Sequence, residues 1–318
     1  MPIVAAAPPQ HLTTPGSFDY VTVDTVNRRV YAAHTGGAQL LIVDADRGKI
    51  LGLVTVGPTH GVAVNPASGH VYAGIGSDPS TGDDTGAVSE IDPVTMKEVN
   101  RVTVEGPVDA IAFDPKLHQI YADEDDGTRI FVIDSLTFKE IGSIALPGKK
   151  PEYIQVDSKT HQIYQNLADM SEIAVIDPHT LTMWRTIPTP EIQNNHALQF
   201  DAPFNQLWVL GENNKLSIYS DTGKLLQTID FPTRVDQCSL DATRQLFACG
   251  GDGQLTLVQY DGKHAPAIVG QTAIPQGVHT LAIDPQTGWI WIVWGDAKRA
   301  FVQPFVYSGP AAPIHSPS

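Results

Sequence analysis

His60-Gly-Val-Ala-Val-Asn65, followed by Tyr72, is one of seven related segments in this chain, and their repetition decides the fold. Each segment starts with His or a carboxylate, alternates apolar and small residues, and ends in Asp or Asn. The starts recur every 40 to 49 residues, and an aromatic side chain follows the closing Asp or Asn by six or seven residues. The first residues are Asp19, His60, Asp109, Glu152, His196, Asp236 and His279, and the aromatics are Tyr31, Tyr72, Tyr121, Tyr164, Trp208, Phe247 and Trp291.

Each copy reads as a strand, a turn and a second strand, with two more strands after it. A third strand ends in an apolar-Asp pair in several copies, as at Ile133-Asp134 and Ile176-Asp177, and a fourth strand follows, as at 98–104. Four antiparallel strands joined by short turns form a propeller blade. A repeat of this period indicates one closed unit rather than separate domains. We therefore predict an all-β, seven-bladed β-propeller with four-stranded antiparallel blades.

The last copy has only three evident strands, which end near 301–307. An N-terminal strand within 3–14 would supply the missing outer strand and close the ring, leaving no open edge. The alternative, an open solenoid, needs polar capping repeats, and none is visible. We expect one domain over 1–318, with 1–14 as leader and closing strand and 308–318 as a flexible tail.

The blades resemble the YVTN family of β-propeller repeats. The resemblance rests on Pro58-Thr-His-Gly-Val-Ala-Val-Asn-Pro66, on Val71-Tyr-Ala-Gly74 and on Val175-Ile-Asp-Pro-His-Thr180. It covers nearly the whole chain and implies the propeller fold. It does not choose a function, because such propellers serve as enzymes, cofactor holders and binding platforms.

Composition excludes several classes of protein. The formal net charge is −15, so the basic face of a nucleic-acid binder is missing. No apolar run is long enough to span a membrane. The start of the chain is not an intact signal peptide, but it resembles the start of a mature exported chain with an added Met, so we expect a periplasmic or secreted monomer, with a cytoplasmic location as the alternative. Cys238 and Cys249 lie on adjacent strands and form either a disulfide or two buried thiols.

The first position of the repeat suggests a metal site. The innermost strand of every blade starts there, so all seven side chains should meet at one mouth of the channel. Imidazoles and carboxylates in one space are ligands for Zn, Fe, Mn, Ni or Cu. We predict a divalent transition metal held by His60, His196, His279 and Glu152, with Asp19, Asp236 and His34 around the ligands and with Glu152 or Asp109 moving protons. Polar residues that merely line a wet channel entrance are the alternative.

Loops near the same mouth supply a second candidate group. Five cations and two aromatic side chains are expected to receive a small, anionic or polyol-like substrate; they are Lys149, Lys150, Arg234, Lys298, Arg299, Tyr153 and Trp294. Dispersed, solvated charges are the alternative.

These residues predict a metal-dependent lyase or hydrolase, or an oxygenase if the metal is Fe or Cu. A non-catalytic propeller that binds a metal, a ligand or another protein is the alternative. The sequence contains no GxSxG, P-loop, dinucleotide-binding or HExxH motif.

Overall fold

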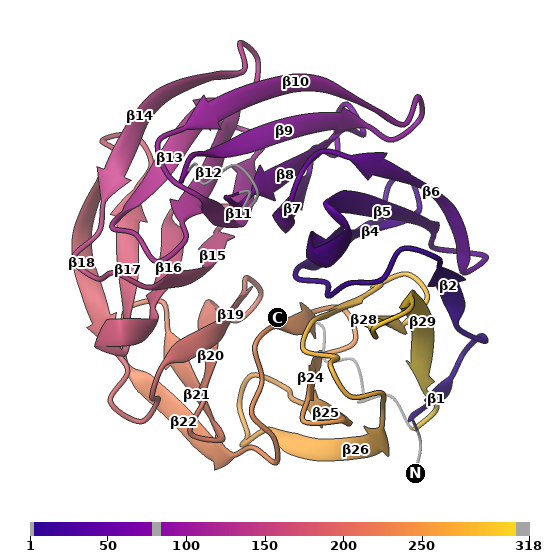
Figure 1. Ribbon diagram of the computed structural model, residues 1–318. Coiled ribbons are helices and arrows are strands. Elements are labelled where there is room, and N and C mark those ends of the chain that lie inside the picture. The colour runs from indigo at the N-terminus through magenta and orange to yellow at the C-terminus, as the bar shows by residue number, and fades with distance from the viewer. Residues whose placement is uncertain (1–2, 78–83, 310–318) are drawn as a thin grey trace.

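The computed structural model describes residues 3–77 and 84–309 and shows seven β-sheets arranged as blades around a central channel (Figure 1). Six blades have four strands each, and the seventh is completed from the N-terminal segment. The predicted all-β propeller of seven antiparallel blades is therefore confirmed. Within the described residues, no helix is long and apolar enough to cross a membrane. Most of the predicted flexible tail, residues 310–318, lies outside the described residues.

The strands follow one another from the channel outward in each of the first six blades. The first blade has β3 (Val21–Asp24), β4 (Arg29–His34), β5 (Gln39–Asp44) and β6 (Lys49–Thr55); the second has β7 (Thr59–Val64), β8 (Val71–Ile75), β9 (Gly86–Asp92) and β10 (Lys97–Val104). The third has β11 (Val108–Asp114), β12 (Gln119–Glu124), β13 (Arg129–Asp134) and β14 (Lys139–Ala145); the fourth has β15 (Pro151–Val156), β16 (Ile163–Leu167), β17 (Glu172–Asp177) and β18 (Thr182–Pro188). The fifth has β19 (Asn195–Asp201), β20 (Gln206–Gly211), β21 (Lys215–Ser220) and β22 (Leu225–Asp230); the sixth has β23 (Cys238–Asp241), β24 (Leu246–Gly251), β25 (Gln254–Gln259) and β26 (Ala267–Ala273).

The seventh blade closes the ring. Its strands β27 (Leu281–Ile283), β28 (Trp289–Gly295) and β29 (Ala300–Tyr307) are joined at the outer edge by β1 (Ile3–Ala5) and β2 (Gln10–Leu12), which both pair with β29. Val4 lies opposite Val306, so the first and last strands of the chain are neighbours. The N-terminal closing strand is thus confirmed. Two short 3-10 helices, η1 (Thr35–Gly37) and η2 (Ala168–Met170), lie between strands.

The repeated aromatic residues of the second strands form the contacts between blades. All seven are at most 1% exposed. Trp208, for example, packs against Phe247 of the next blade with ring centroids 5.1 Å apart. Burial of such large side chains stabilises a fold by about 3–5 kcal/mol each, judged by truncation to Ala, so the aromatic repeat identified in the sequence is what holds neighbouring blades together.

The repeated Asp or Asn shapes the turn between the first two strands. In the first blade, Asp24 Oδ1 accepts hydrogen bonds from the N–H groups of Val26 and Asn27 at 2.9 and 2.8 Å. The turn then ends at Arg28 with a φ of 54°, and the equivalent residue of every blade also has a positive φ. Such a side-chain turn needs an N–H two residues on. The side-chain oxygens of Asp201 accept no hydrogen bond from the N–H two residues on because that position is Pro203.

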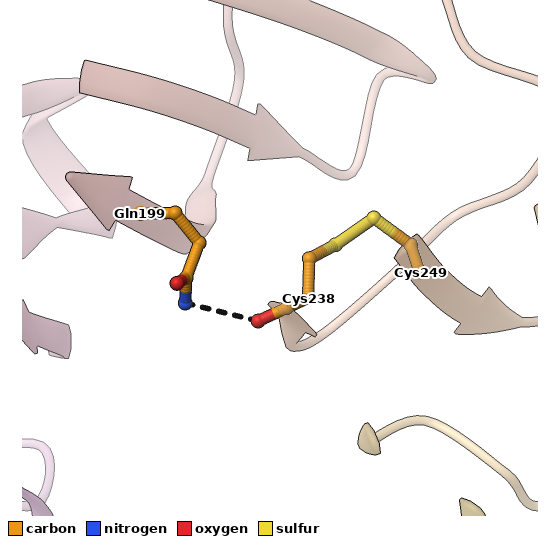
Figure 2. Close-up of a disulfide and its surroundings, with 3 residues drawn as sticks. All are labelled: Gln199, Cys238 and Cys249. Atoms are coloured by element: carbon orange, nitrogen blue, oxygen red, sulfur yellow. Dashed lines mark hydrogen bonds between the residues drawn. A yellow bond between two sulfur atoms is a disulfide. The ribbon is translucent and has the colours of Figure 1, made fainter. Parts of the chain in front are cut away.

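The two cysteines form a disulfide across the innermost hairpin of the sixth blade (Figure 2). Cys238 of β23 and Cys249 of β24 are directly opposite in the strand register, with Cα atoms 4.4 Å apart. Gln199 of the fifth blade donates a hydrogen bond to the Cys238 carbonyl at 2.9 Å. Of the two alternatives that the sequence left open, the structure has the disulfide.

Candidate metal centre and binding pocket

The first residues of the seven repeats meet at one mouth of the channel, as the repeat register predicted. Six of them form two separate groups rather than one, and the seventh, His279, lies beside the second group. In each group, one imidazole and two carboxylates place a ligand atom within 4.8 Å of one another. We call them the Asp19 cluster (Asp19, His60, Asp109) and the Glu152 cluster (Glu152, His196, Asp236).

The Glu152 cluster joins the fourth, fifth and sixth blades. His196 Nδ1 lies 3.3 Å from Glu152 Oε2 and 3.7 Å from Asp236 Oδ1. This nitrogen is buried and makes no hydrogen bond of good geometry. Burial alone would lower the pKa of His196, but its contacts with Asp236 and Glu152 raise that pKa to about 10. The space between these three side chains therefore requires a positive charge, which a proton or a metal ion can supply.

A second imidazole lies beside this cluster. His279 Nδ1 is 3.7 Å from Asp236 Oδ2, while its Nε2 is 2.6 Å from the Phe18 carbonyl oxygen. A carbonyl only accepts hydrogen bonds, so Nε2 carries the proton and Nδ1 faces Asp236. Imidazoles that bind metals are commonly fixed by such an acceptor on the other ring nitrogen. His196 Nε2 lies 3.6 Å from Glu212 Oε1, which is beyond hydrogen-bond distance.

The Asp19 cluster is bonded differently. His60 Nδ1 is 2.7 Å from Asp19 Oδ2, which is hydrogen-bond distance, and 3.7 Å from Asp109 Oδ1. Gln237 donates a further hydrogen bond to Asp19 Oδ1 at 2.7 Å. Burial alone would lower the pKa of His60, but the bond to Asp19 outweighs it and the pKa is raised. An imidazole this close to its carboxylate leaves no room for an ion between the two atoms.

Asp109 connects this cluster to a buried carboxyl that the sequence did not single out. Asp123 of β12 is fully buried and accepts hydrogen bonds from the Ala110 N–H at 2.6 Å and from Gln165 at 2.8 Å. Burial raises the pKa of both Asp109 and Asp123 well above their usual range, and neighbouring carboxylates raise that of Asp109 further. These two groups therefore hold protons at pH values where exposed carboxyls have lost them.

Tyr20 forms a floor beneath the two clusters. Its hydroxyl donates a hydrogen bond to the Glu152 carbonyl at 3.0 Å, which links the first blade to the fourth across the channel. Tyr153, predicted as part of an apolar wall, packs on Tyr20 with ring centroids 5.4 Å apart. A separate cavity of about 310 Å³ is lined by Tyr20, Tyr153 and residues further along the innermost strands. The two tyrosines thus lie between this cavity and the mouth.

We expect Tyr20→Phe to lower the free energy of unfolding by about 1 kcal/mol, because the Glu152 carbonyl loses its partner. The variant should also weaken metal binding, since Glu152 is then less firmly positioned. Denaturant unfolding and metal titration measure the two effects. Tyr164→Phe is the matched control, because it removes a hydroxyl that bonds only to Gln162 within the same blade; an equal loss of metal affinity in both variants would contradict the role given to Tyr20.

A pocket of about 340 Å³ opens beside the Glu152 cluster between the fifth, sixth and seventh blades. His196, Asp236 and His279 form one side of it, and Glu212, Arg234 and Asp252 line the remainder together with Gln276 and small or apolar residues. Its size is at the lower end of the range for small-molecule sites. Glu212 and Asp252 follow the second strands of their blades, which run back toward the mouth; that direction was the available signal for finding them.

Most of the predicted rim residues lie elsewhere. Of the five cations, only Arg234 lines the pocket. Lys150 lies 3.7 Å from Asp126, while Lys149, Lys298 and Arg299 belong to turns whose backbone N–H groups bond to Asp169 or Asp296. Trp294 stacks on Phe301. His34 is fully buried against Phe18, with ring centroids 4.6 Å apart, and burial lowers its pKa.

Comparisons with known proteins show the fold and no more. No family model matches the chain, and no curated protein sequence matches it. Among solved structures, hydrazine synthase of Kuenenia stuttgartiensis is similar, with a TM-score of 0.76, 14% sequence identity, and coverage of 92% of this chain and 95% of that one. At this identity the likeness shows a shared propeller architecture. The choice of function therefore depends on the geometry of the site.

Interatomic spacing distinguishes the two clusters chemically. Ligand atoms that surround one ion tetrahedrally at about 2.0–2.2 Å lie about 3.3–3.6 Å from each other. The distances from His196 Nδ1 to the two carboxylates, 3.3 and 3.7 Å, are close to this spacing, whereas the 2.7 Å between His60 and Asp19 is that of a hydrogen bond. The predicted ligands His196 and Glu152 thus share one space with Asp236, and His279 lies next to it. His60 belongs to the other cluster.

Proposed function

We propose that this protein is a metal-dependent enzyme whose active site is the Glu152 cluster and the pocket beside it. The proposal rests on the distances from the buried Nδ1 of His196 to the carboxylates of Glu152 and Asp236, which are close to those between ligand atoms around one ion. One or two imidazoles with carboxylates suit Zn, Mn, Fe, Ni or Cu. The structural neighbour titled a synthase agrees with catalysis on this fold only in general terms. We also propose that the chain is a YVTN-type propeller, on its repeat motifs.

Each side chain of the site would have its own role. Glu152, His196 and Asp236 would hold the ion, and His279 would be available as a further nitrogen ligand. A bound divalent ion would supply Lewis-acid polarisation of a substrate oxygen. Because burial and the neighbouring carboxylates raise the pKa of Asp109 well above its usual range, it would act as a proton donor rather than a base. Elimination or hydrolysis fits these roles, with oxygen chemistry if the ion is Fe or Cu.

The disulfide supports an exported location. Disulfides persist mainly in oxidising compartments, and Cys238 and Cys249 are bonded while being at most 1% exposed. This favours the periplasm or the exterior of the cell.

Elemental analysis of the purified protein tests the proposal. We expect about one equivalent of a first-row transition metal per chain, and we expect a strong chelator to abolish turnover of any substrate found by screening, with recovery when the metal is returned. A protein that carries and binds no metal would overturn the proposal. A protein that binds metal stoichiometrically but turns over no substrate with it would point instead to the non-catalytic metal-binding propeller.

A further inference from the structure

The pocket offers no free cation to an anionic ligand. Arg234 is the only lysine or arginine among its lining residues, and Asp252, 3.8 Å from its guanidinium, offsets its charge. Lys150, the other rim cation with a carboxylate partner, is paired with Asp126 outside the pocket. The positive charge of a protonated His196 is balanced by Glu152 and Asp236, which both contact the same nitrogen.

Carboxylates, in contrast, are accessible. Glu212, Asp236 and Asp252 line the pocket with side chains that are 49, 37 and 49% exposed. A divalent ion in the Glu152 cluster would neutralise Glu152 and Asp236. Glu212 and Asp252 would then still exceed Arg234 by one charge, so the pocket stays negative with or without the ion. The chain as a whole, at a formal charge of −15, adds to the same potential.

We infer that this pocket takes a small molecule that carries a protonated amine together with an oxygen able to reach the Glu152 cluster. The inference deepens the proposed function and rests on the pocket being its substrate site. Glu212 and Asp252 would accept hydrogen bonds from the ammonium group, and the apolar side chains of Val235 and Val278 in the same lining would contact the carbon frame. It replaces the anionic substrate expected from the sequence, because four of the five rim cations lie outside the pocket.

Three four-carbon probes that differ in charge test the inference: butane-1,4-diamine, butane-1,4-diol and succinate. Binding to the full chain is measured by calorimetry, in metal-loaded protein and in chelated protein, at low and at physiological salt. We expect the diamine to bind at least tenfold more tightly than succinate in both forms, with the diol between them. We expect the difference to shrink at higher salt, because the carboxylates are solvent-exposed.

Variants then test which groups are responsible. Glu212→Gln and Asp252→Asn should each weaken diamine binding about two- to fivefold, the size expected for exposed ion pairs. Arg234→Gln should strengthen it, since a competing cation is removed. Asp230→Asn is the matched control, because Asp230 lies on β22 and pairs only with Lys215 outside the pocket; it should change nothing.

Succinate or the diol binding as tightly as the diamine would overturn the inference, as would a diamine affinity that neither Glu212→Gln nor Asp252→Asn lowers. The metal content of the same samples keeps the two proposals separate. Preference for the diamine in protein that binds no metal supports the inference while the proposed enzyme fails. Preference for succinate in protein that holds one metal per chain leaves the metal site intact and overturns the inference alone.

Discussion

His196→Ala is expected to remove the metal almost completely, from about one equivalent per chain to less than about a tenth, and to abolish any metal-dependent turnover. Its Nδ1 is the atom on which both carboxylates of the Glu152 cluster converge. Without it, Glu152 and Asp236 remain as two carboxylates on different blades with no nitrogen ligand between them. Elemental analysis and a metal titration of the variant measure the loss.

His60→Ala is the matched control for this prediction. His60 occupies the equivalent position in its own blade. Its side chain is 23% exposed, as is that of His196. Its Nδ1 is bonded to Asp19 at 2.7 Å, so it should be dispensable for the metal. We expect His60→Ala to retain more than half of the metal. Loss of metal in His60→Ala together with retention in His196→Ala would place the ion in the Asp19 cluster and contradict our assignment.

The fold could be predicted from the sequence because its determinants are local and repeated. The turn carboxylates, such as Asp24, bond to N–H groups two and three residues away, and the aromatic that follows each turn always faces the neighbouring blade. Both interactions are encoded within one repeat of the chain. Seven copies then fix the blade number, and the N-terminal strands close the ring for lack of any other partner for β29.

That the first residues of the seven repeats lie near one another could also be predicted, but their division into two clusters could not. Equal positions in successive blades converge on the axis, whatever their side chains. Which atoms then meet depends on hydrogen bonds between blades, such as Gln237 to Asp19 and His279 to Phe18. These partners lie 218 and 261 residues apart in the chain, and no local pattern relates them. His60 and His196 look equivalent in the sequence for this reason, although one is hydrogen-bonded and the other is available.

The set of residues that line the pocket could not be predicted for a related reason. The register places a loop cation such as Lys298 near the mouth, but it does not determine where the side chain points. Glu212 comes directly after the last residue of β20, so the sheet fixes where its backbone lies beside the pocket. Residues directly after a strand are better candidates for a site than residues further along a loop when only the register is known.

Asp123→Asn is expected to stabilise the protein by more than about 1 kcal/mol at pH 8. Asp123 is fully buried, and burial raises the pKa of its carboxyl well above the value of an unfolded chain. As the pH rises through about 4, the unfolded chain releases this proton while the folded protein keeps it, so stability falls until the pH reaches the folded pKa. Asn does not ionise and avoids that loss, so the advantage of the variant should grow from pH 4 to pH 8.

The hydrogen bonds of this site can accommodate the amide. Asn at position 123 keeps an oxygen for the Ala110 N–H, and its NH₂ group can donate to Gln165 Oε1, which has no partner at present. The rotation of Gln165 that this requires ends the two bonds that its NH₂ group donates, at 2.8 Å to position 123 and at 3.3 Å to the Asn166 carbonyl, and the first is replaced by the new bond. Denaturant unfolding at several pH values measures the difference between the variant and the parent protein.

Asp177→Asn is the control with the opposite sign. Asp177 accepts the backbone N–H of His179 at 2.8 Å, and this bond holds its pKa below the usual value. Ionised Asp177 therefore stabilises the folded protein above the pKa of the unfolded chain, and this stabilisation is lost as the pH falls. Asp177→Asn should destabilise the protein at neutral pH and destabilise it less in acid. If Asp123→Asn behaved like Asp177→Asn, with a loss of stability at pH 8 that diminished toward pH 4, Asp123 would be an ionised carboxylate. An ionised Asp123 would at the same time repel a charge on its neighbour Asp109 and raise the pKa of that carboxyl further.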